Sequence, residues 1–477
     1  MPRQVVLQNC FNAGEIDPLV YGRVDISKYA TSCRALQNFI PTVQGPVQKR
    51  GGLRYIGEAK YPNRRCVLVP FKSSATEHYV LEFGHGYIRF WTVRGQIIVS
   101  GEPYEIVSPY SISDLVAADG TPLIQTVQSG DVLYIACPTV YPQMLTKVSA
   151  TNWKIQKFIP VGGPWDEPNT TESRKISASG RSGSVTLSAG FDVFKSTDVG
   201  RQVRLEIESY DVYQPWESDR DYRPEDLNTN VYVVNDMKIY RFVRYRSTSE
   251  NGYIRSGTRQ PTHTRGSAWD GYGNFINREG HTEKCGLEWR YDNCGYGIAT
   301  ITAVTDARTA TATVQSKYPL PSGINTYRWT LGAWHGGIEF PRSVTFFRER
   351  LVWAGGNRIW MSRVGDFNSF EDKDYTEVTA ECAITLVVAP DRVQWVSPGP
   401  SLFVGTEGGE IIIGESTSAD PLGPANIKQE PQTSCGSKAI QPVRAGAATL
   451  FVHRSGKQLH ELVYDYNSDS FTVPNLN

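Results

Sequence analysis

Hydrophobic and polar residues alternate over short stretches along most of this 477-residue chain, and turn residues separate the stretches. Residues 78–83 and 87–91, for example, are two such stretches on either side of a Gly-His-Gly turn. A period of two is typical of half-buried β-strands, and long runs with the 3.6-residue period of an α-helix are nearly absent. The pattern therefore predicts an all-β protein.

The predicted strands fall into five groups, and each group reads as an antiparallel meander. The groups span residues 66–99, 123–159, 343–362, 393–413 and 440–473. The second strands of the last four groups can be aligned with one another, at 132–136, 350–354, 401–405 and 449–453. Repeats of about 40–50 residues with four strands each are typical of a β-propeller. The alternative is a large β-sandwich with several hairpins.

Residues 165–335 interrupt this repeat. Shorter strand signals near 185–207 and 297–330 predict a small β-barrel or platform domain inserted between two blades, with a long sub-insertion at about 208–296. The sequence thus predicts four segments: an N-terminal arm with the first strands (1–60), the first blades (61–164), the inserted domain (165–335) and the remaining blades (336–477).

The sub-insertion separates acidic from basic residues. Residues 206–226 are mainly acidic, whereas 238–265 combine arginine with aromatic residues. Arginine and tyrosine are enriched in protein interfaces, so we expect a protein interface here, with a solvated surface or a DNA contact as alternatives. A further hypothesis is that the acidic arm of one copy meets the basic arm of the next and favours ring closure. The candidate interface residues are Tyr240, Arg241, Arg244, Tyr245 and Arg246.

Charge and cysteine content narrow the classes of function. The chain has 49 Lys plus Arg and 49 Asp plus Glu, so its formal net charge is zero. Tight binding of nucleic acid usually needs a basic excess, so we expect no strong grip on DNA, although passage of DNA through a channel remains compatible. The eight scattered cysteines predict reduced thiols. We expect neither a signal peptide nor a membrane-spanning segment.

The sequence contains no familiar catalytic motif. GxSxG, Walker A, HExxH and Rossmann patterns are missing, and the repeated boxes of sialidase propellers are missing too. We expect no enzymatic activity, no cofactor and no metal. His263, His281, Cys285 and Cys294 lie in one loop-rich stretch, but their spacing matches no familiar zinc site. Two thiols and two surface imidazoles are the expected state, with a Cys285–Cys294 disulfide as an alternative under oxidising conditions.

Two regions of the sequence resemble a known family. The N-terminal region contains FNAGEIDPLVYGRVD (11–25), NFIP (38–41) and QGPVQKRGGLRY (44–55). The later region contains FPRSVTFFRERL (340–351), WMSR (360–363), GDFNSF (365–370) and LFVGTEGGE (402–410). In sequence and in order, these segments resemble the tail nozzle proteins of podoviruses, the family related to tail tubular protein B.

The resemblance implies a structural protein of the virion tail, assembled in the host cytoplasm. Such a protein is a β-propeller with an inserted platform-like domain. It forms a homohexameric ring on the tail adaptor protein, closes the tail, lets double-stranded DNA pass during genome ejection, and in some cases anchors fibres. Lys49, Arg50 and Arg54 are then expected at a ring-to-ring interface. Family members usually run longer than this chain, and the 208–296 insertion has no counterpart that we can place. The alternatives are a receptor- or glycan-binding tail propeller and, third, an enzyme acting on host polysaccharide.

Overall fold

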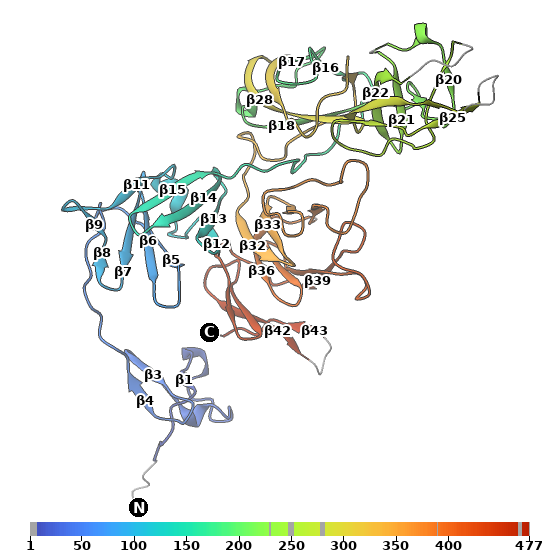
Figure 1. Cartoon of the computed structure of the whole chain (residues 1–477). Coiled ribbons are helices and arrows are strands. Elements are labelled where there is room, and N and C mark those ends of the chain that lie inside the picture. Colours follow the sequence, from blue (N-terminus) through green and yellow to red (C-terminus); the bar gives the residue numbers. More distant parts are fainter. Residues whose placement is uncertain are drawn as a thin grey trace, which may run out of the picture.

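The computed structural model describes residues 7–228, 230–246, 252–276, 282–388, 390–465 and 470–476. These residues form an all-β fold and confirm the predicted fold class. A propeller lies in the middle of the molecule, the inserted domain lies at one end and the N-terminal arm at the other (Figure 1). No helix among the described residues is long and apolar enough to cross a membrane.

Five antiparallel sheets form the propeller and follow one another in chain order. Blade 1 contains β5 (Val67–Lys72), β6 (His78–Gly84), β7 (Tyr87–Thr92) and β11 (Glu105–Val107), and blade 2 contains β12 (Gln125–Ser129), β13 (Val132–Cys137), β14 (Val140–Ser149) and β15 (Asn152–Lys157). Blade 3 contains β32 (Ser343–Phe347), β33 (Arg350–Gly355), β34 (Arg358–Met361) and β35 (Ile384–Val387), and blade 4 contains β36 (Val393–Pro398), β37 (Leu402–Thr406), β38 (Glu410–Gly414) and β39 (Lys428–Thr433). Blade 5 contains β40 (Val443–Ala445), β41 (Ala448–Val452), β42 (Leu459–Asp465) and β43 (Ser470–Thr472). The short helix α1 (Ile112–Leu115) connects blades 1 and 2.

The outer strands of three blades differ from the sequence prediction. In blade 1 the fourth strand is β11, whereas the predicted strand at 96–99 forms the short strands β8 (Gly95–Gln96) and β9 (Ile98–Val99). Strand β9 leaves the blade and pairs with β10 (Glu102–Pro103). Strands β35 and β39, which close blades 3 and 4, were not predicted from the sequence pattern. Each of these two strands follows a long loop, so neither continues a visible hairpin.

A separate hydrophobic core fills each space between consecutive blades. Because successive side chains of a strand point to opposite faces, β13 contributes to two of these cores. Leu133 and Ile135 pack against blade 1, whereas Tyr134 and Ala136 pack against blade 3. Blades 3 and 4 share the next core, and blades 4 and 5 share the last, around Trp395. The blades are therefore stacked face to face, and the middle ones are buried on both sides.

Amide side chains bridge the propeller axis. The first strands of blades 2, 3 and 4 lie next to one another at the centre, with β32 contacting both β12 and β36. Gln125 of β12 is buried and donates to the carbonyl of Gln394 in β36, at 2.9 Å. Gln441, just before β40, forms two hydrogen bonds with the backbone of Thr126, at 3.0 and 2.8 Å. Opposed blades thus meet across the axis through direct hydrogen bonds.

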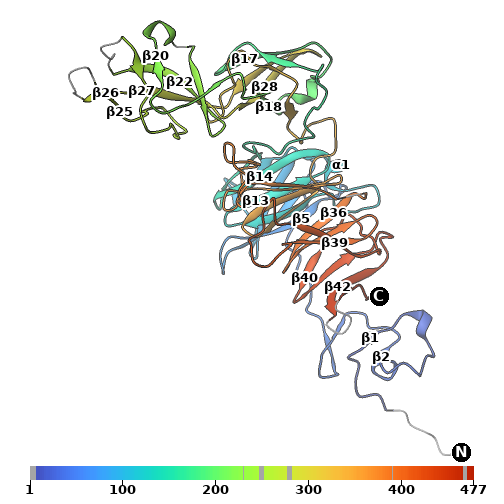
Figure 2. The same ribbon diagram turned by 90° about the vertical axis from the view of Figure 1, so that its right-hand side faces the viewer.

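The N-terminal arm extends away from the propeller (Figure 1, Figure 2). It contains only short elements: β1 (Gly14–Glu15), η1 (Pro18–Val20), η2 (Tyr29–Thr31), β2 (Ser32–Cys33), β3 (Phe39–Pro41) and β4 (Val47–Lys49). Strands β1 and β2 pair in parallel, and β3 and β4 form a hairpin. Few of its side chains are buried, so the arm lacks a substantial core of its own.

Among the described residues, the inserted domain has two main sheets and two small two-stranded ones, β20 (Asp221–Tyr222) with β23 (Ile254–Arg255) and β25 (Gly273–Ile276) with β26 (Thr282–Cys285). The first, a seven-stranded barrel-like sheet next to the propeller, contains β16 (Ile176–Ala178), β17 (Ser184–Ala189), β18 (Gln202–Glu206), β28 (Tyr296–Asp306), β29 (Thr309–Val314), β30 (Asn325–Thr326) and β31 (Trp329–Leu331). The second, here called the outer sheet, contains β19 (Gln214–Pro215), β21 (Tyr232–Asn235), β22 (Lys238–Tyr245), β24 (Ser267–Trp269) and β27 (Leu287–Asn293). The outer sheet lies beyond the barrel-like sheet (Figure 2).

Candidate interface on the inserted domain

Strands β22 and β27 form the centre of the outer sheet, and alternation along them separates core residues from candidate contact residues. Tyr240, Phe242 and Trp289 are buried in the core of the sheet. The hydroxyl of Tyr240 donates to the carbonyl of His263 at 3.1 Å. Tyr240 is therefore a core residue, and its inclusion in the predicted interface is corrected: the aromatic residue at that position is explained by strand packing.

Arg244 and Arg246 lie at the exposed end of the outer sheet, where their guanidinium groups contact aromatic rings. The Arg244 guanidinium pairs with Glu288 at 2.5 Å and lies 5.5 Å from the ring centroid of Trp269. The Arg246 guanidinium lies 4.2 Å from the same ring and 4.3 Å from that of Tyr272. Tyr245 between them is partly exposed. Flat arginine and aromatic groups held in this way form a preorganised surface of the type that proteins use for contact.

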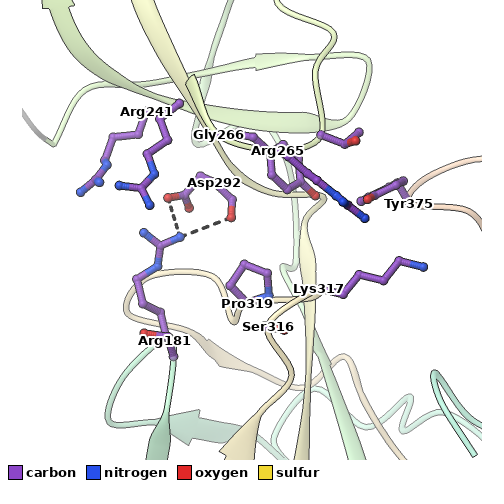
Figure 3. Close-up of a pocket in the computed structure, with 13 residues that line it drawn as sticks. Arg181, Arg241, Arg265, Gly266, Asp292, Ser316, Lys317, Pro319 and Tyr375 are labelled. Atoms are coloured by element: carbon purple, nitrogen blue, oxygen red, sulfur yellow. Dashed lines mark hydrogen bonds and ion pairs between the residues drawn. The ribbon is translucent and has the colours of Figure 1, made fainter. Parts of the chain in front are cut away.

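Arg241 faces a cavity on the side of the sheet opposite its core. The cavity measures about 630 Å³ and lies where the outer sheet, the barrel-like sheet and a propeller loop meet. Arg265 and Arg290 line it together with Arg241, and Figure 3 shows Arg181 reaching toward Asp292 from the barrel-like sheet. That ion pair has a length of 2.5 Å. The predicted basic stretch thus splits into two sites, an exposed aromatic end and this cavity.

The acidic and basic arms of the sub-insertion contact each other within the chain. Asp221 in β20 (Asp221–Tyr222) lies opposite Arg255 in β23 (Ile254–Arg255), and the two side chains form two hydrogen bonds of 2.7 and 3.0 Å. Glu206 of the acidic stretch is also paired within the chain, with two cations outside the basic stretch: Arg204 at 2.9 Å and Lys373 at 3.2 Å. Part of the charge complementarity that the sequence suggested for neighbouring copies is therefore used inside one copy.

Lys49, Arg50 and Arg54 are exposed on the N-terminal arm. Lys49 ends β4, and the Nε of Arg50 donates to the side chain of Asn38 at 2.8 Å. The arm and the outer sheet lie at opposite ends of the molecule (Figure 1, Figure 2). The structure thus does not bring the two groups of predicted interface residues together, and they form two separate surfaces.

The residues considered for a metal site do not form one in the described part of the chain. No group of three or more metal-binding side chains occurs among the described residues, and His281 lies outside them. Cys285 and Cys294 are both buried and are not joined to each other. Burial lowers the pKa of His263 and raises the pKa of Cys294, so both groups are held in their neutral forms near pH 7.

Sequence reasoning missed the remaining residues of the cavity. Arg181 and Lys317 come from loops of the barrel-like sheet, and Tyr375 comes from a loop of blade 3, so only the fold brings them together. Arg290 did carry a signal: it follows Trp289 in an alternating stretch, which places it on the face opposite the buried tryptophan.

Comparisons with known proteins leave the family open. No protein-family model matches the chain, and no curated protein is similar to it in sequence. Among solved structures, the crystal structure of Citrobacter koseri AztD superposes on 86% of this chain and 95% of that chain, with 10% identity and a TM-score of 0.20. So low a TM-score carries no argument about fold or function.

Proposed function

We propose that this protein is a structural subunit of the tail nozzle of a short-tailed bacteriophage, acting in the virion as a ring on the tail adaptor. In this role it has no catalytic activity. The proposal combines the segments that resemble the podovirus nozzle family with one structural observation, the exposed N-terminal arm. The expected assembly is a homohexamer that closes the tail and lets double-stranded DNA pass during ejection, with fibres as further partners.

The N-terminal arm carries the proposal because it exposes large hydrophobic side chains. Leu19, Val43 and Leu53 are 91%, 90% and 88% exposed. Burying such side chains contributes about 1.5–3 kcal/mol each relative to leaving them in water, so an arm that exposes several of them is stabilised when a contact covers them. An arm with little core of its own gains its order by packing on another subunit. The same arm holds Lys49, Arg50 and Arg54, which are suited to the polar rim of such a contact.

The bridged propeller axis supports an arrangement with the channel between copies. Gln125 and Gln441 connect opposed blades directly, so a duplex of DNA has no path along that axis. A ring of several copies, by contrast, encloses a central opening of its own. The zero net charge of the chain suits passage of DNA, because many fixed cations along the wall would retain the phosphates.

The aromatic end of the outer sheet is the second expected contact. Arg244, Arg246 and Trp269 lie far from the arm, so one copy presents two distinct surfaces. Two different surfaces on one subunit favour head-to-tail contacts, which generate rings when the rotation closes. Either surface also suits the adaptor or a fibre.

Mass photometry of the full chain, alone and mixed with its candidate adaptor, tests the proposal. We expect particles of about six copies, formed on the adaptor if not by the chain alone. Leu53→Asp should abolish assembly without unfolding the protein, because Leu53 is exposed in the single chain. Val93→Asp is the matched control: Val93 is 80% exposed in a turn of blade 1, outside the arm.

A stable monomer that ignores every tail protein would overturn the nozzle proposal. If that monomer were retained by host glycans, the alternative of a receptor- or glycan-binding tail propeller would replace it. Hydrolysis of host polysaccharide would instead favour an enzyme.

A further inference from the structure

The cavity between the two sheets of the inserted domain has an unusual balance of charge. Five cationic side chains line it, and Asp292 is the one carboxylate among the lining residues. Asp292 forms an ion pair with Arg181, at 2.5 Å. Lys317 pairs with Glu371 at 2.7 Å. The other three cationic residues of the cavity are Arg241, Arg265 and Arg290. Among the described residues, none of these three arginines forms an ion pair with a carboxylate.

Two of these arginines are held directly opposite each other. Arg241 in β22 and Arg290 in β27 are register partners in the antiparallel ladder, so their side chains leave the same face of the sheet. Like charges at directly opposite positions destabilise a sheet. Burial adds to this cost, because the Nε atoms of Arg241 and Arg181 are buried without a hydrogen-bond partner in the described structure. An anion in the cavity would remove both penalties together.

The size and walls of the cavity indicate what kind of anion fits. At about 630 Å³ it can hold a compact ligand, and Tyr291 and Tyr375 add aromatic surface to its lining. Arginine forks pair with phosphate through two parallel hydrogen bonds, which a lysine cannot do. Figure 3 shows Arg265 near Tyr375 and Arg241 on the opposite side, so the charges surround the hollow.

We infer that this cavity is a binding site for a compact ligand with two or more phosphate groups. The phosphates are expected to engage Arg241, Arg265 and Arg290, and the ligand body packs on Tyr375. Duplex DNA fits less well, because its phosphates need a track of cations along the surface and these cations surround one hollow. The same chemistry comes from two sources, a phosphorylated saccharide of the bacterial envelope or free polyphosphate. The affinity for a polyphosphate does not depend on the nozzle proposal, whereas the envelope saccharide as a source rests on it.

Calorimetric titration of the full chain with inorganic tripolyphosphate at low salt tests the inference. We expect saturable binding with a stoichiometry of one per chain. Arg265→Gln and Arg290→Gln should each weaken it by at least about tenfold, the effect of losing one charge-assisted hydrogen-bonded pair. The matched control is Arg259→Gln, an exposed arginine of the same sub-insertion outside the cavity lining, which should leave the affinity within about twofold.

A second titration identifies the source of the phosphate. A phosphorylated core oligosaccharide of lipopolysaccharide that binds tighter than tripolyphosphate, and loses its affinity after dephosphorylation, indicates a saccharide. Equal or tighter binding of tripolyphosphate indicates free polyphosphate. Both outcomes support the inference.

Three results would overturn it. The first is no saturable binding of either probe by the wild-type chain. The second is equal weakening by Arg259→Gln, which would show diffuse attraction by surface charge. The third is binding of a 20-base-pair DNA duplex, sensitive to Arg265→Gln and Arg290→Gln, in the absence of binding to tripolyphosphate. The double variant Arg241→Gln/Arg290→Gln, checked for folding by thermal unfolding, supplies the reference without the opposed pair.

Discussion

The propeller and the outer sheet use arginine in opposite ways. In the propeller, Arg350 is fully buried between blades and its Nη atoms donate to five backbone carbonyls, those of Ser362, Ala380, Glu381, Cys382 and Leu422. Burial lowers the pKa of Arg350 to about 10, yet the group stays charged at neutral pH. In the outer sheet, Arg241 and Arg290 lie directly opposite each other, and no ion pair of either one with a carboxylate occurs among the described residues.

This difference separates arginines that hold the fold from arginines that are free to bind. Arg350 connects β33 to the loop that ends at β35 and to a loop of blade 4, so its hydrogen bonds hold these two long loops against the blade. Arg241 and Arg290 of the outer sheet form no ion pair with a carboxylate among the described residues, and their opposed positions in the ladder raise the free energy of the sheet. A side chain that costs stability and faces a cavity is a better indicator of function than one whose partners are all internal.

Replacement of the buried arginine should give the largest effect. Arg350→Met leaves several buried carbonyls without a donor, and we expect it to lower the free energy of unfolding by about 3–5 kcal/mol. Urea unfolding followed by tryptophan fluorescence measures it. Arg348→Met, two residues earlier in the exposed turn, removes an ion pair with Glu415 and should cost less than about 1 kcal/mol. Equal losses of unfolding free energy in Arg350→Met and Arg348→Met would show that the buried arginine does not stabilise the propeller more than an exposed one.

Removal of the opposed arginines should raise the free energy of unfolding, whereas the loss of Arg350 lowers it. Arg241→Gln/Arg290→Gln relieves a like-charge pair, so we expect the outer sheet to become more stable by about 0.2–1 kcal/mol. Thermal unfolding at low ionic strength measures the gain, which should shrink as salt screens the repulsion. A clear loss of stability would mean that these arginines support the sheet, and the contrast with Arg350 would then disappear.

The smallest expected effect is a pH dependence that arises in the outer sheet. Burial lowers the pKa of His263 below its ordinary value of about 6.5, so the unfolded chain binds the proton more readily than the folded one. The stability from this group is complete above pH ~6.5 and falls as the pH drops toward the folded pKa. Thermal unfolding measured between pH 7.5 and pH 5 should show a smaller loss of stability in His263→Gln than in the wild-type chain. An equal loss of stability between pH 7.5 and pH 5 in His263→Gln and in the wild-type chain would contradict this assignment.

The central strands of the blades could be predicted from the sequence because burial on both faces leaves a strong signal. Strands β13, β33, β37 and β41 are apolar on both faces or alternate clearly, and the aligned second strands of the prediction correspond to them. The edge strand β39 has the polar sequence KQEPQT and one exposed face, so its pairing depends on β38 and not on its own pattern.

The cavity could be predicted only in part, because its residues are far apart in the chain. The basic, aromatic stretch pointed to Arg241 and Arg265, but nothing local indicated that Arg181 or Tyr375 would lie beside them. Tyr240 shows the opposite error, since composition alone did not distinguish an aromatic core residue from an exposed one. Strand register settles such cases, and register follows from long-range pairing.

The bridged axis of the propeller also has a consequence for the central opening of any ring that this chain forms. A propeller with an open axis has a bore determined by its number of blades. Here Gln125 and Gln441 connect blade 2 directly to blades 4 and 5. In the proposed ring, the diameter of the central opening would depend on how many copies meet and on the angle between their contact faces. We therefore expect small rotations of whole subunits to change the opening while every blade keeps its shape.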